Sequence, residues 1–168
     1  MATRDLLLQS NGGVCSRDTA RHTGDPVLLW INPTNANDGN TGTNADCNGG
    51  TTAYTDYLKG DLGAVRKVTS MHIKGANSTD FDNFEFWDGF SWRTLSTTWD
   101  GIGWNNPAGA TYTVDGGYVA ARYVAIKCSH HGSSGATLNT WEVFGDDFGI
   151  SLARPKKSLL AIAGGPWS

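Results

Sequence analysis

The sequence has few of the residues that favour helices and no long apolar run. Only 17% of its 168 residues are charged, and just two of the 16 acidic residues are glutamates, Glu85 and Glu142. Glutamate, lysine and leucine favour helices, whereas aspartate, asparagine, glycine and threonine favour turns and strands. A predominantly helical protein is therefore not expected. No stretch approaches the roughly 18 apolar residues that a membrane-spanning helix needs.

An excess of basic residues and a leader segment are also lacking. The net charge of −3 and the pI near 5.7 argue against a general nucleic-acid binder, which needs a basic surface to neutralise phosphates. The leucine run at 6–8 is too short for the core of a signal peptide. The sequence therefore predicts a protein made in the cytoplasm without a signal peptide, with no membrane span and no nucleic-acid partner.

The cysteines and the catalytic motifs narrow the function classes further. Cys15, Cys47 and Cys128 form neither an even set nor a zinc-binding pattern. Two alternatives stay open: a bridge between Cys15 and Cys47, or reduced thiols that pack in the core, as free cysteines usually do. No metalloprotease, serine-hydrolase, phosphate-binding or dithiol redox motif is present, so the sequence predicts a protein that is not an enzyme.

Glycine and short apolar runs are what the sequence does have. It contains 22 glycines, and apolar runs at 27–31, 71–73, 112–114, 122–126 and 138–144 are separated by Gly, Asn and Asp clusters. This spacing is typical of an antiparallel sandwich or barrel. Phe84 and Phe86 flank Glu85, so a strand there would put both rings on one face. We therefore predict an all-β protein with an N-terminal segment (1–24), an antiparallel β-sandwich (25–147) and a C-terminal arm (148–168).

The arm differs in character from the sandwich. It contains the apolar run 159–163 and ends on Trp167 and Ser168, and an apolar surface of this kind would promote aggregation if left in solvent. Two alternatives stay open: the arm packs on its own sandwich, or it docks on a neighbouring subunit. The second alternative predicts a homo-oligomer or a larger assembly.

Six stretches, in chain order, resemble the motifs of the discoidin family, also called the coagulation factor 5/8 type C or galactose-binding-like domain. Asp-Gly-Asn, Asp-Leu-Gly and Ala-Arg-Tyr-Val-Ala-Ile are among them, and the stretches span 38–43, 57–63, 68–73, 87–92, 121–126 and 138–145. The resemblance covers about residues 25–145. It implies a discoidin-like jelly-roll sandwich and a carbohydrate-binding function.

Ligands of this family sit on loops at one end of the sandwich. The resemblance therefore draws attention to three loops, whose tryptophan, amide and imidazole groups suit the apolar faces and hydroxyls of a sugar. The alternative roles are loop packing or a subunit interface for the tryptophans and turn formation for the asparagine near 75–80. The candidate ligand-binding residues are Asn77, Trp99, Trp104, Asn105, His130 and His131.

The resemblance also implies a structural calcium ion, Ca2+, which many members hold in the Asp-Gly-Asn loop. Asp38, Asn40 and Thr43 match the loop positions, but the family's glutamate falls on Thr140, and the nearest carboxylate is Glu142. Calcium takes six to eight oxygen ligands, carboxylates among them. The alternatives are a calcium site completed by Glu142 or a loop in which Asp38 caps a turn.

Two functions follow from this pattern. A small sandwich with an arm suits a virion component, such as a bacteriophage decoration, head-fibre or tail protein, which binds other virion or appendage subunits through 148–168 and contacts a host glycan. The alternative is a free-standing, lectin-like adhesion module that binds a cell-surface glycan. Under the first hypothesis the protein lies on the surface of the virion or appendage.

Overall fold

The computed structural model describes residues 4–23, 30–47, 54–74, 81–96, 110–130 and 136–147. Within these ranges the chain is built of strands and two short 3-10 helices, which confirms the all-β prediction. No helix there is long and apolar enough to cross a membrane. The helices are η1 (Gln9–Asn11) and η3 (Pro33–Asn37); the strands are β1 (Arg4–Asp5), β2 (Val14–Arg17), β3 (Trp30–Ile31), β4 (Ala45–Cys47), β5 (Tyr54–Lys74), β6 (Phe81–Trp87), β7 (Trp92–Ser96), β8 (Ala110–Thr113), β9 (Val119–His130), β10 (Ala136–Leu138) and β11 (Thr140–Asp146).

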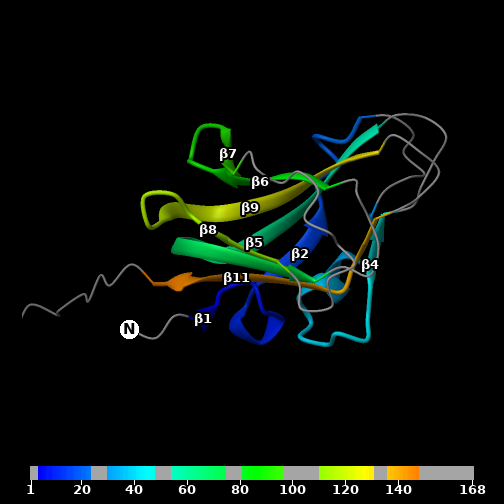
Figure 1. Ribbon diagram of the computed structural model, residues 1–168, viewed down its shortest axis with the longest axis horizontal. Coiled ribbons are helices and arrows are strands. Elements are labelled where there is room, and N and C mark those ends of the chain that lie inside the picture. Colours follow the sequence, from blue (N-terminus) through cyan, green and yellow to red (C-terminus); the bar gives the residue numbers. More distant parts are fainter. Residues whose placement is uncertain are drawn as a thin grey trace, which may run out of the picture.

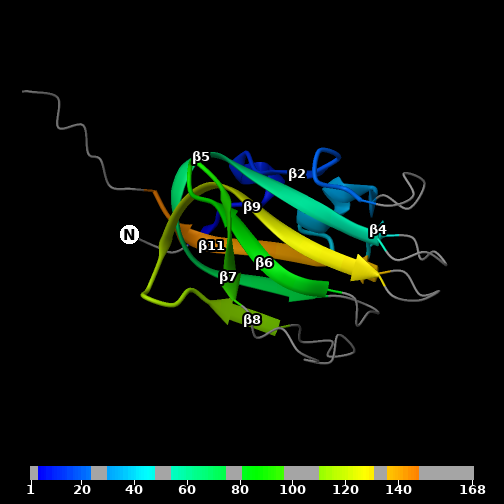
Figure 2. The same ribbon diagram turned by 90° about the horizontal axis from the view of Figure 1, so that it is seen from above.

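The 21-residue strand β5 runs through both layers of the sandwich. Its first half pairs with β2 and β9, and β9 in turn pairs with β6, which pairs with β7; this is the first layer. Its second half pairs with β11 and β8 and still with β9 at residues 66–68, and β11 pairs with β1; this is the second layer of the same eight-stranded sheet. Strands β10, β4 and β3 form a separate three-stranded sheet. The strand bends where the register with β9 breaks between Asp61 and Arg66, and Gly63 there adopts a φ of 76° that glycine tolerates best. Figures 1 and 2 show β5 folding back on itself.

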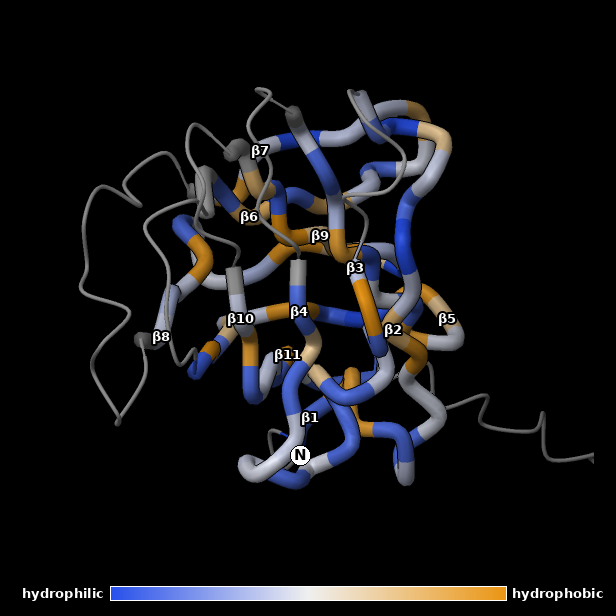
Figure 3. The backbone as a smooth tube through the Cα atoms, turned by 90° about the vertical axis from the view of Figure 1, so that its right-hand side faces the viewer, coloured by the Kyte–Doolittle hydropathy of each residue, from blue (hydrophilic) through white to orange (hydrophobic). Residues whose placement is uncertain are grey.

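The core lies between the two layers. Trp30, Phe84 and Trp141 are its largest fully buried side chains, and the hydrophobic stretches of β3 and β9 lie in the middle of the molecule (Figure 3). The predicted alternation in β6 is confirmed, since Phe84 is buried and Phe86 packs on the core, while Glu85 bonds an arginine on the outer face. Sandwich packing of this kind follows from alternate residues pointing to opposite faces of each strand.

The N-terminal residues that we predicted to precede the sandwich are part of it. Strand β1 pairs with β11, and β2 pairs with β5. Leu6, Leu7 and Cys15 belong to the buried core. The prediction missed them because three leucines after Arg4 carry no period-two signal. Cys15 and Cys128 are both buried, and Cys15 takes part in no disulfide bridge, so the alternative of a bridge between Cys15 and Cys47 is wrong. Burial raises the pKa of the Cys15 thiol well above its ordinary value.

Candidate ligand-binding site

Strand ends meet at one end of the sandwich, which we call the loop end. There Tyr54, the first residue of β5, pairs with His130, the last residue of β9. Phe81 pairs with Cys128, and Ile73, near the end of β5, pairs with Ala110. Figures 1 and 2 show the tip of β9 and both ends of β5 on this side of the molecule. Since paired residues are neighbours, the described chain reaches the loop end at each of these points.

Each predicted ligand loop connects two strands, and at least one of the two joins the loop at the loop end. Residues 75–80 join β5 to β6, residues 97–109 join β7 to β8, and residues 131–135 join β9 to β10. His130 is the last residue of β9 and pairs with Tyr54. The fold therefore brings the strand ends beside residues 75–80 and 131–135 to the loop end, where Ala110 also lies, whereas Ser96 pairs with Phe84 farther along β6. The other candidates lie outside the described residues: Asn77, Trp99, Trp104, Asn105 and His131.

The Asp-Gly-Asn loop follows η3 and is held by its own hydrogen bonds. Asp38 Oδ1 accepts a hydrogen bond from the backbone N–H of Asn40 at 2.7 Å, and Asp38 Oδ2 accepts one from Thr43 Oγ1 at 2.7 Å. The Asn40 side chain in turn accepts a bond from the N–H of Gly42 at 3.0 Å. These are the contacts of an aspartate that caps a turn, which was the second alternative for this loop.

Of the residues predicted to hold calcium, Asp38, Asn40 and Thr43 lie together in this loop, and Glu142 is engaged elsewhere. The carboxylate of Glu142 lies 2.6 Å from His72 Nδ1. Thr140, at the position of the family's glutamate, is buried and has no carboxylate. The side-chain amide of Asn139, between β10 and β11, donates a hydrogen bond of 2.6 Å to the side-chain oxygen of Asn44, which follows the Asp-Gly-Asn loop. In the part of the chain that the structure describes, no three His, Cys, Asp or Glu side chains form a group that could hold a metal. Of the two predicted carboxylates only Asp38 lies in this loop, so the calcium site stays a prediction of the resemblance and we derive no role for a metal.

A groove on the outer face of the first layer was not predicted. It has a volume of about 370 Å3 and combines three aromatic with three charged side chains. Part of the signal was in the sequence, because period-two alternation places Lys59 and Trp87 on outward-facing positions of their strands. The sequence did not reveal that Asp18 and Arg21, in the segment after β2, line the groove. The contacts of Arg21 with β6 and β7 join residues far apart in the sequence. The groove is lined by Trp87, Trp92, Tyr123, Asp18, Arg21 and Lys59, together with Ala20.

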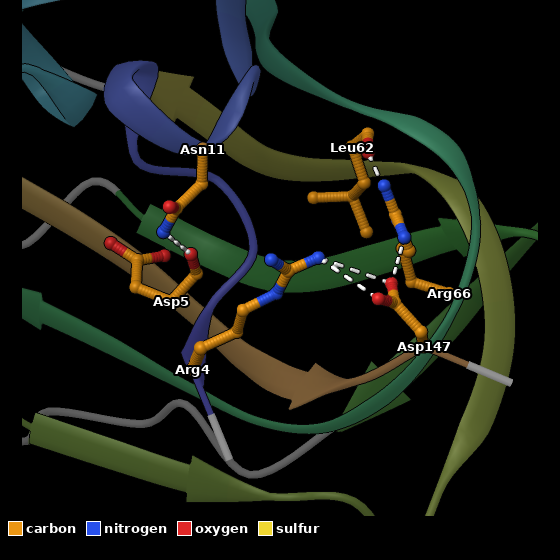
Figure 4. A network of polar contacts seen from close by, with 6 residues as sticks. All are labelled: Arg4, Asp5, Asn11, Leu62, Arg66 and Asp147. Atoms are coloured by element: carbon orange, nitrogen blue, oxygen red, sulfur yellow. Dashed lines mark hydrogen bonds and ion pairs between the residues drawn. The ribbon is translucent and has the colours of Figure 1, made fainter. Parts of the chain in front are cut away.

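The end of the sandwich opposite the loop end joins the two termini of the described chain. The carboxylate of Asp147 lies 3.1 Å from Arg4 Nη2 and also pairs with Arg66 (Figure 4). Arg66 Nε donates a hydrogen bond to the carbonyl of Leu62 at 3.3 Å. Residues 148–168 follow Asp147 directly, so the arm starts at the far end from the predicted ligand loops (Figure 1).

Comparisons with known proteins agree with this fold. No protein-family model matches the chain, and no curated protein matches it. A family 32 carbohydrate-binding module of NanJ from C. perfringens, solved in complex with galactose, is 20% identical with a TM-score of 0.60 over 85% of this chain and 99% of that one. Chitosan-binding module 1 of a chitosanase/glucanase from Paenibacillus sp. IK-5 is 17% identical with a TM-score of 0.62 over 86% and 100%.

A larger protein shares the fold over a small part of its length. The family 89 glycoside hydrolase from Clostridium perfringens is 18% identical with a TM-score of 0.57, over 91% of this chain but 16% of that chain. The similarity therefore concerns one module-sized part of the hydrolase. Together with the layer arrangement described above, these comparisons show that the chain has the discoidin-like, galactose-binding β-sandwich fold of the family 32 carbohydrate-binding modules.

Proposed function

We propose that this protein is a non-enzymatic carbohydrate-binding module whose ligand site is formed by the loops at the loop end. One observation carries the proposal: residues 75–80 and 131–135 follow strand ends at the loop end, and Ala110, which follows residues 97–109, pairs with β5 there. Loops held by a rigid sheet are the usual place for binding residues. The galactose-bound module of C. perfringens with the same fold supports the ligand class.

The sugar is proposed to contact the aromatic and amide side chains of 97–109 and the imidazoles at 130–131. Tryptophan offers a flat apolar face to the C–H groups of a pyranose ring, and amides and imidazoles supply hydrogen bonds for its hydroxyls. A pocket that combines a few aromatic surfaces with a few placed polar groups is the usual form of a small-ligand site. Trp104 and His130 are therefore the residues whose loss should weaken binding most.

A glycan array tests this proposal. The full chain is expected to bind a restricted set of glycans, and Trp104→Ala and His130→Ala should each reduce binding by about tenfold or more, as loss of an aromatic or hydrogen-bonding anchor does. Phe90→Ala is the control, because Phe90 is 91% exposed on the β6–β7 turn, away from the loop end. A wild-type chain that binds no glycan, or a Trp104→Ala variant that binds as well as wild type, contradicts the proposal.

We further propose that the module is carried by an assembly, such as a virion or an appendage, through residues 148–168. The support is the position of Asp147, whose pairing with Arg4 and Arg66 fixes the start of this segment opposite the loop end. A module attached at one end can present a glycan site at the other end. Native mass spectrometry of the full chain should then show a trimer or a larger ring, and a monomer at micromolar concentration would contradict the assembly role while leaving the glycan proposal intact.

A further inference from the structure

The outer groove of the first layer is walled by aromatic rings. Trp87 and Trp92 are paired in register on the β6–β7 hairpin, and their ring centroids lie 5.8 Å apart at an interplanar angle of 62°. Tyr123, on the neighbouring strand β9, lines the same groove. A volume of about 370 Å3 lies within the usual size range of small-ligand sites. The aromatic surface is therefore large enough to receive a sugar ring.

Arg21 fixes the position of this aromatic wall. Its guanidinium carbon lies 3.8 Å from the ring centroids of both Tyr57 and Trp92, so the cation is held between two rings. Its Nε donates to Asp18 at 2.8 Å and its Nη1 donates to Glu85 at 2.5 Å. Contacts of this kind between a guanidinium and aromatic faces are favourable, and the two carboxylates orient the group further. Trp92 is thus held in one orientation before any ligand arrives.

Lys59 places a positive charge on the rim of the groove, beside the aromatic rings. Asp18 and Glu85 are both bonded by Arg21. Asp61, two residues along β5 from Lys59, accepts two bonds from Arg122 at 3.0 Å, which lower the pKa of its carboxyl. Among the described residues Lys59 has no ion-pair partner, and its Nζ lies 5.7 Å from the Tyr123 ring centroid. Its ammonium therefore stands at the edge of the aromatic surface.

We propose that this groove is a second carbohydrate site, which binds a glycan that carries a carboxylate, such as a uronic acid residue. The rings of Trp92 and Trp87 would contact the C–H face of the sugar, and the ammonium of Lys59 would donate a charge-assisted hydrogen bond to its carboxylate. Charge complementarity selects the acidic sugar over a neutral one. This site goes beyond the function proposed for the loop end.

The two sites are separate surfaces. Tyr123 lies seven residues before His130 on β9, which places the groove about 20 Å from the tip of that strand at the usual rise per residue. Figure 1 shows the β6–β7 hairpin on the side of the molecule away from the tip of β9. A ligand in the groove therefore does not touch the residues proposed to bind at the loop end.

Calorimetric titration of the full chain with a galacturonic acid trisaccharide tests this inference, with the neutral galactose trisaccharide as the matched ligand. Wild type should bind the acidic sugar more tightly than the neutral one. Lys59→Gln should weaken binding of the acidic sugar by about tenfold, the effect of one lost charge-assisted bond, and Lys59→Arg should restore part of it. Trp92→Ala should weaken binding of both sugars in the groove, provided that thermal unfolding shows the variant to be folded.

The loop-end variant distinguishes the two proposals. Trp104→Ala should leave binding of the acidic trisaccharide unchanged. If wild type does not bind the acidic trisaccharide at millimolar concentration, or if Lys59→Gln binds it as well as wild type does, the inference is wrong. If Trp104→Ala abolishes binding while Lys59→Gln does not, the sugar binds at the loop end and the groove proposal fails while the proposed function stands.

Discussion

Gly145→Ala is expected to destabilise the protein severely, by about 3 kcal/mol or more, because overpacking against backbone cannot be relieved by a side-chain rotation. A Cβ atom at this position would lie 1.9 Å from the carbonyl oxygen and 2.9 Å from the carbonyl carbon of Lys67. Gly145 also sits where the register of β11 against β5 shifts, and it pairs with Arg4 of β1. An added methyl group would therefore push β11 away from both of its neighbours.

Urea unfolding of the full chain measures this effect, with Gly42→Ala as the matched control. At Gly42 a Cβ would lie 3.2 Å from the side-chain oxygen of Asn40, which can move, so the midpoint of unfolding should change little. The Gly145→Ala variant should unfold at much lower urea or be recovered unfolded. If both variants unfold at the wild-type midpoint, the claim that β11 passes too close to β5 at Gly145 to admit a side chain is wrong.

Trp141→Ala is expected to reduce the free energy of unfolding by about 4 kcal/mol, because truncation of a buried aromatic residue leaves a large cavity. Trp141 is fully buried on β11, opposite Ile73 of β5 in the second layer. Its indole nitrogen has no hydrogen-bond partner among the described residues, so its contribution comes from packing. Trp141→Phe keeps most of this contact area and should cost clearly less.

The same unfolding measurement compares the two Trp141 variants with wild type. The expected order of stability is wild type, then Trp141→Phe, then Trp141→Ala, with unchanged dependence on urea concentration if the transition stays two-state. Equal stability of Trp141→Ala and wild type would show that Trp141 does not lie in the core between the two layers.

The parts of the fold that depend on local pattern could be predicted from the sequence. Phe84 and Phe86 alternate with Glu85, and the structure places the rings toward the core and the carboxylate on the outer face. A turn also follows the apolar run 112–114, where a glycine cluster separates it from the next run, with positive φ at Gly116 and Gly117. Such features follow from the period of a strand and from the backbone freedom of glycine, which operate over a few residues.

The features that join distant residues could not be predicted in this way. The length of β5 depends on its partners in both layers, and the sequence of 54–74 alone does not reveal that one strand runs through the Asp-Leu-Gly motif. The place of Leu7 and Cys15 in the core depends on pairing with β5 and β11. The outer groove depends on Arg21, which reaches Trp92 and Glu85 from a segment more than sixty residues earlier.

The candidate site could be predicted only in part, because its loops follow from local motifs whereas the contacts of Glu142 depend on distant residues. The resemblance identified three loops, and the pairing of the flanking strands shows that each of them meets the loop end with at least one of its ends. The calcium set was inferred from the loop motif, but whether Glu142 could join it depended on where β11 directs its carboxylate. In the structure that carboxylate contacts His72 of β5, which the spacing of Thr140 and Glu142 could not reveal.

The central claim, that a glycan binds at the loop end, is tested most directly by NMR titration of the isotope-labelled full chain with a glycan selected on the array. The account predicts amide chemical-shift changes at the strand residues that flank the ligand loops, Lys74, Phe81, Ala110 and His130, and none at Arg4 or Asp147 at the opposite end. Changes confined to the opposite end, or no changes at saturating glycan, would contradict it.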